Sequence, residues 1–61
     1  DLDAAMQKLA DAHPEAAQHV ELRFFAGMSN DEAAELMGCG SRTGTRLWTF
    51  ACAFLRAKLE G

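Results

Sequence analysis

The stretch "MSNDEAAELMGCGSRTGTRLW", residues 28–48, decides how this chain is expected to fold. Its "SNDE" motif is a capping box, because the Ser29 hydroxyl can accept a hydrogen bond from the Glu32 amide while the Glu32 carboxylate reaches back. Gly38 then ends a short helix, since glycine readily adopts the left-handed conformation that a tight inter-helix turn requires. A second helix begins near Ser41. The stretch therefore predicts a helix-turn-helix.

The rest of the chain continues the helical pattern. Of the 61 residues in the whole chain, 49% are apolar and one is proline. Ala, Leu, Glu and Met, which are helix formers, predominate. We predict an all-α, compact four-helix domain over residues 1–61, cut from a longer protein because the chain starts at Asp1. The helices are expected over residues 2–11, 14–26, 30–37 and 41–59.

Apolar spacing along these helices indicates the core. On the last helix, one stripe (Trp48, Cys52, Leu55 and Leu59) is expected to face the core, and a second (Leu47, Phe50 and Phe54) to touch the first helix. Cys39 is expected to plug the inter-helix turn. The side chains predicted to be largely buried are Val20, Phe24, Leu36, Met37, Trp48 and Leu55.

Charge is divided unevenly along the chain, whose net charge is −3. Residues 1–38 carry eight acidic residues against two basic ones, whereas residues 39–61 carry four basic residues against Glu60 alone. This asymmetry indicates a face that meets an anion. The alternative is a solvated helix that places its bases where its dipole favours them.

Several classes of function find no support in the sequence. No Ser/His/Asp triad or pair of carboxylates is recognisable, so we expect no enzyme, no catalytic residue and no cofactor. The residues His13, His19, Cys39 and Cys52 lack the spacing of metal ligands, and no metal site is predicted. Two cysteines do not make a disulfide framework, and no apolar run approaches the ~18 residues that span a bilayer. A cytoplasmic protein without membrane contact is expected.

A helix-turn-helix presents the start of its second helix to the major groove of DNA. Here "VELRFFAGMSNDEAAELMG" followed by "SRTGTRLWTFACAFLRAKL" resembles the C-terminal region-four domain of bacterial extracytoplasmic-function (ECF) sigma factors. The resemblance covers about residues 2–59. It implies a monomeric domain that binds the minus-thirty-five promoter element through its last helix. It also implies docking on the flap of the β subunit of the RNA polymerase core, and a surface open to an anti-sigma factor.

The resemblance also indicates which residues meet DNA. Arg42, Thr43 and Arg46 match the basic and hydroxyl positions of the recognition helix, where arginine can bind guanine and threonine a phosphate or a thymine methyl. Residues Arg42 to Arg46, with Thr45 among them, are expected to enter the major groove, and Ser41 is also expected to bind DNA. Arg23 and the helix start at Ser29 are expected to contact flanking phosphates.

The chain departs from the family pattern in three ways. Gly44 stands where the family usually has a buried valine, and should cost about 1 kcal/mol in helix propensity. Thr45 replaces a frequent lysine, which removes one charge for phosphate. Gly40 and Ser41 replace the usual helix start, although Ser41 can itself cap a helix. These departures bear on how tightly DNA is bound, and not on the fold.

Two alternatives to the sigma factor stay open at this point. One is the helix-turn-helix output domain of a response regulator, which dimerises through its last helix. The other is a protein-interaction module that has lost its affinity for DNA, which Gly44, Thr45 and the acidic first half favour. Salt-dependent binding to a promoter duplex distinguishes the DNA-binding readings from the interaction module.

Overall fold

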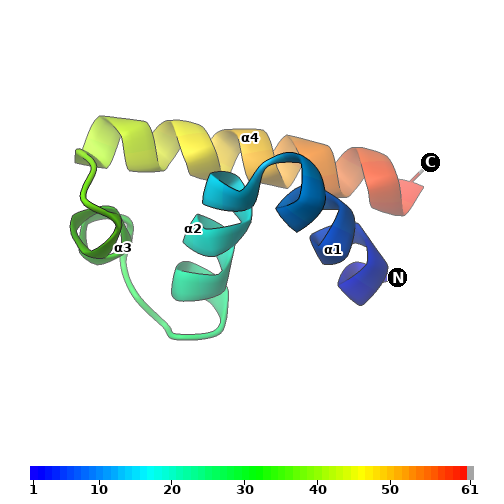
Figure 1. The fold of residues 1–61 in the computed structure, drawn as a ribbon, viewed down its shortest axis with the longest axis horizontal. Helices are drawn as coiled ribbons and strands as arrows, with labels where there is room; N and C mark the ends of the chain where they lie inside the picture. The colour runs from blue at the N-terminus through cyan, green and yellow to red at the C-terminus, as the bar shows by residue number, and fades with distance from the viewer. Residues whose placement is uncertain (61) are drawn as a thin grey trace.

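The computed structural model describes residues 1–60 and contains four helices, with no strand in that range. They are α1 (Leu2–Ala12), α2 (Pro14–Phe24), α3 (Asn30–Met37) and α4 (Ser41–Glu60). Helix α4 lies along one side of the molecule, and the three shorter helices lie against it in sequence order from its C-terminal to its N-terminal end (Figure 1). With 20 residues it is about 30 Å long, close to the 32 Å long axis of the domain. The predicted all-α fold is confirmed.

The helix starts and stops follow the local sequence. Pro14 opens α2, where its missing amide hydrogen costs nothing. The predicted capping box at the start of α3 is present with both of its hydrogen bonds. Gly38, with a φ of 79°, ends α3 in the left-handed conformation, as expected. Helix α2 ends at Phe24, two residues before the predicted end, and Gly27 takes a φ of 73° in the turn that follows.

Helix α4 begins at Ser41, as predicted, but its cap is a different residue from the one expected. The amide of Gly44 donates the first helical hydrogen bond to the carbonyl of Gly40 (3.0 Å), so Gly40 stands at the cap position. Ser41 is therefore the first residue inside the helix and does not cap it.

The core forms where α1, α2 and α4 meet. Leu9 is fully buried, and its burial contributes about 1.5–3 kcal/mol to folding. Half-buried side chains from α4 pack against this centre, including Phe54 and Leu47 from the stripe that was expected to touch the first helix. The buried residues of this cluster are Leu9, Ala16, Ala17, Val20 and Ala51.

Burial departs from the prediction at several large side chains. Val20 is buried as predicted, and Met37, Trp48 and Leu55 are half-buried. Phe24 and Leu36 were expected in the core, but they are 63% and 61% exposed. From the stripe expected to face the core, Cys52 and Leu59 are exposed as well. The reason is size: a domain this small buries a limited share of its surface, and most of its buried residues are alanines, which are distributed over all four helices.

Candidate nucleic-acid interface

The contact between α3 and α4 is built from very small residues. Ala33 and Ala34 on α3 are buried, and so is Gly44 on α4. A Cβ atom on Gly44 would lie 2.8 Å from Oδ1 of Asn30 and 3.1 Å from Cβ of Ala34. The helices therefore approach too closely for a side chain at position 44, and no space is left for the valine that is usual in the resembled family.

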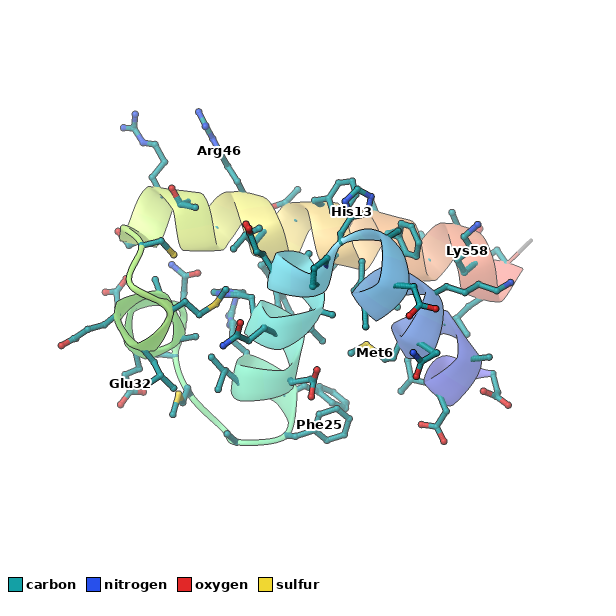
Figure 2. All side chains as sticks on the ribbon, viewed as in Figure 1. Met6, His13, Phe25, Glu32, Arg46 and Lys58 are labelled. Atoms are coloured by element: carbon teal, nitrogen blue, oxygen red, sulfur yellow. The ribbon has the colours of Figure 1, made fainter. Side chains whose placement is uncertain are left out.

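This close contact fixes which way the basic residues point. Gly44 faces the other helices, and residues two places before and after it on a helix lie roughly on the opposite side. Arg42 and Arg46 occupy these two places, and both are exposed. Figure 2 shows Arg46 extending away from α1, α2 and α3. The predicted basic face of the last helix is thus free of the core.

The electrostatics of the helix starts single out α4. Acidic residues stand in the first turns of α1 (Asp3), α2 (Glu15) and α3 (Asp31 and Glu32), but none stands in the first turn of α4. The positive end of the α4 dipole is therefore not neutralised by a carboxylate of its own first turn. Together with Arg42 and Arg46, it makes this end of the helix attractive to a phosphate.

Two threonines lie between the two arginines in the sequence. Thr43 is exposed and lies in the first turn of α4. Thr45 is also exposed, but its hydroxyl donates to the carbonyl of Ser41 (3.1 Å) and accepts from Nδ2 of Asn30 (3.3 Å). The Thr45 hydroxyl is thus engaged within the protein, and Thr43 is the residue of the pair whose hydroxyl is better placed for DNA.

Ser29, a predicted phosphate contact, has a structural role at the start of α3. Its hydroxyl accepts from the amide of Glu32 (3.1 Å), and its amide donates to the Glu32 carboxylate (2.9 Å). The hydrogen bond from the Ser29 amide, and after it the nearby Ser29 hydroxyl, hold the pKa of the Glu32 carboxyl below its ordinary value of 4.5. The carboxylate already occupies the position that a phosphate would take.

Arg23, the other predicted phosphate contact, lies over a different face of α4. Its guanidinium stands 4.1 Å from the centre of the Trp48 ring, in a cation–π contact. Because Trp48 follows Arg46 by two residues, the two side chains leave the helix on nearly opposite sides. The structure therefore brings together Ser41, Arg42, Thr43, Thr45 and Arg46 but leaves Arg23 apart.

Two polar residues, His19 and Asn30, lie beneath the start of α4, where the sequence analysis did not expect them. His19 is fully buried, and neither of its ring nitrogens has a hydrogen-bond partner. Burial, and then the nearby Arg23 charge, lower its pKa below 6.5, while the neighbouring Asn30 acts in the opposite sense without forming a hydrogen bond. Asn30 reaches from α3 to α4. Its place in the "SNDE" motif indicated only a helix start, so local spacing gave no sign of this contact.

A second surface lies on another side of the domain. An apolar groove of about 160 Å³ opens between α1, the end of α2 and α4. Phe25 lies at the end of α2 and Met6 on α1 (Figure 2). The groove is lined by Leu2, Met6, Val20, Phe24, Phe25, Trp48, Cys52 and Leu55. It accounts for several large side chains that the core leaves exposed.

The fold and the exposed basic helix start are those of a helix-turn-helix DNA-binding domain. The family model for ECF sigma factors matches residues 1–61, and the chain belongs to this family. Its four helices are consistent with region four of these factors. None of the curated proteins and none of the solved structures matches the chain.

The family assignment gives the general role of the chain. Sigma factors act in transcription initiation, with RNA polymerase and promoter DNA, and this role decides against the response-regulator alternative. They are regulatory DNA-binding proteins and not catalysts. In the described part of the chain, no three His, Cys, Asp or Glu residues are grouped to hold a metal ion. No helix there is long and apolar enough to cross a membrane.

Proposed function

We propose that this chain is one domain of a longer sigma factor and recognises the minus-thirty-five promoter element with the first half of α4. The observation that carries the proposal is the outward placement of Arg42 and Arg46 on a helix start that has no acidic residue in its first turn. Residues 1–38, which precede α4, are strongly acidic and repel DNA. The start of α4 is therefore where we expect DNA to approach.

The residues divide into two groups by their roles. Arg42, Arg46 and Thr43 enter the major groove, where each arginine can read a guanine and the threonine a thymine methyl or a phosphate. Ser41 lies at the edge of this contact and meets the backbone of the DNA, whereas Thr45, whose hydroxyl is hydrogen-bonded to Ser41 and Asn30, supports the start of α4. Arg23 and Ser29, which were predicted to touch phosphates, support the domain from within, as their contacts with Trp48 and Glu32 favour.

Polymerase docking is the second part of the proposal. We infer that the flap of the β subunit binds the apolar groove between α1, α2 and α4, and that an anti-sigma factor competes for the same surface. Exposed apolar side chains of this extent, such as Phe24 and Phe25, are characteristic of protein-binding surfaces. The domain acts as a monomer in the cytoplasm, where promoter DNA and polymerase are found.

A titration of the ¹⁵N-labelled chain with a promoter duplex at low salt tests the DNA contact. We expect weak binding, because few cationic groups are available, with the largest shifts at Arg42, Thr43 and Arg46. Arg46→Ala should weaken binding by about 1–3 kcal/mol without lowering the melting temperature. The same variant in the full-length factor should reduce promoter-dependent transcription. Shifts centred on the apolar groove, with none at the start of α4, would favour a protein-interaction module instead.

A further inference from the structure

Asn30 joins the start of α3 to the start of α4. It is the first residue of α3, and its Nδ2 donates to the carbonyl of Ser41 (3.1 Å) and to the hydroxyl of Thr45 (3.3 Å). The Thr45 hydroxyl in turn donates to the same Ser41 carbonyl. One side chain thus binds two positions in the first turns of the helix that carries Arg42 and Arg46.

The position of Asn30 depends on the absence of a side chain at Gly44. Oδ1 of Asn30 lies 2.8 Å from the place that a Cβ on Gly44 would occupy, which is closer than real Cβ contacts allow. This oxygen is buried and has no hydrogen-bond partner. Any side chain at position 44 would therefore displace the amide of Asn30. Asn30 can therefore hold this position only because residue 44 is a glycine.

His19 closes the same site from α2. Its Cε1 atom lies 3.1 Å from that Cβ position, and the whole ring is buried. Three helices therefore meet at Gly44, because atoms of Asn30, Ala34 and His19 all lie within 3.1 Å of the same Cβ position. The side chain that links α3 to α4 thus stands at a closely packed junction of α2, α3 and α4.

We propose that Asn30 is a positioning residue for DNA recognition: seated on Gly44, it sets the orientation of the first turns of α4. This inference rests on the proposed function, because it acts through Arg42 and Arg46. Reading a base edge requires a side chain held in a narrow range of geometry, whereas attraction to phosphates requires only charge. Loss of the Asn30 contacts should therefore lower the preference for one DNA sequence while leaving non-specific binding intact.

The test compares Asn30→Ala, Gly44→Ala and the double variant, with Gln18→Ala as a control that removes an exposed amide from α2. The probes are a duplex selected by the unmodified chain from a randomised pool at low salt, and a scrambled duplex of the same composition. Asn30→Ala should reduce the ratio of the two affinities about three- to tenfold, as expected for the loss of one or two hydrogen bonds. Its salt dependence on the scrambled duplex should not change, because both arginines remain.

The double variant separates positioning from general destabilisation. If both residues act through the same contact, the double variant should lose no more sequence preference than Asn30→Ala alone. Additive losses, or a ratio that stays unchanged in a folded Asn30→Ala chain, would overturn the inference. Gln18→Ala should behave like the unmodified chain.

The free chain provides a readout that does not depend on DNA. Residual dipolar couplings should show that the first turns of α4 change their orientation relative to α3 in Asn30→Ala. If the unmodified chain shows no sequence preference, the dipolar couplings alone test the inference. Couplings in Asn30→Ala that equal those of the unmodified chain would contradict it. The proposed function fails separately, if Arg46→Ala binds both duplexes as the unmodified chain does.

Discussion

At its first turns α4 packs against α3 through glycine and alanine, whereas from Trp48 onward it packs against α1 and α2 through large apolar side chains. The first contact leaves no room for a Cβ atom on Gly44, and two hydrogen bonds from Asn30 reinforce it. The second contact leaves an apolar groove partly open. The comparison indicates two roles for one helix: its start is held firmly to present charge, and its remainder keeps apolar surface available to a partner.

The largest expected effect comes from the core of the second region. Leu9→Ala removes a fully buried side chain and should lower the free energy of unfolding by about 2–5 kcal/mol, enough to unfold much of a domain this small. Urea denaturation measures the loss. Leu36→Ala is the matched control, because the same atoms are removed from a side chain that is 61% exposed. Equal losses in the two variants would mean that the core has been placed wrongly.

The next effect tests the first region. Gly44→Val should lower the free energy of unfolding by about 1–3 kcal/mol, because the added atoms meet Asn30, Ala34 and His19 at distances that are already short. Thermal melting measures the change. Ala53→Val, on the exposed side of the same helix, controls for the helix propensity of valine. If the Gly44→Val domain were more stable than the unmodified one, there would be unfilled space beside residue 44, contrary to the close contact described.

Acidification should also weaken the first region. Burial lowers the pKa of His19 in the folded chain below 6.5, so the unfolded state binds the proton first as pH falls. The stability that neutral His19 contributes is complete above pH 6.5 and declines below it, through the folded pKa. His19→Gln should flatten this part of the curve of unfolding free energy against pH. If the curve keeps its slope in the variant, another group is responsible.

The smallest effect on stability should come from the groove. Phe24 is 63% exposed, so Phe24→Ser should change the free energy of unfolding by about 1 kcal/mol or less. Binding of the isolated polymerase flap, measured by calorimetry, should nevertheless be lost, because the aromatic ring lines the proposed docking surface. Leu36→Ser, an equally exposed apolar residue that does not line the groove, should bind normally. A comparable loss in both variants would argue against docking at the groove.

Local rules predicted most of the fold. Capping, glycine and proline signals act within a few residues, and they placed the ends of α1, α3 and α4 within one residue of those observed. Burial was harder to predict, because α4 is apolar around much of its circumference and only packing decides which side is covered. On α2 and α3, apolar spacing placed Phe24 and Leu36 in the core, but packing leaves both of them exposed.

The candidate site likewise contains features that the sequence predicted and features that depend on packing between helices. Arg42 and Arg46 are four residues apart and therefore share one side of the helix, and the sequence analysis predicted that this side would be exposed, as it is. The role of Asn30 was not predictable, since its partners lie 11 and 15 residues away and belong to another helix. Gly44 could be identified as unusual, but only the packing of three helices shows that it permits close contact.

The central claim is that DNA meets the first half of α4, and the salt dependence of DNA binding tests it most directly. Two double variants should be compared, Arg42→Ala/Arg46→Ala and Arg56→Ala/Lys58→Ala, which change the net charge equally and lie on the same helix. In plots of log affinity against log salt, the first should lose about 0.9 of slope for each phosphate contact that is removed. The second should keep the slope of the unmodified chain. Equal slopes in the two variants would contradict the claim.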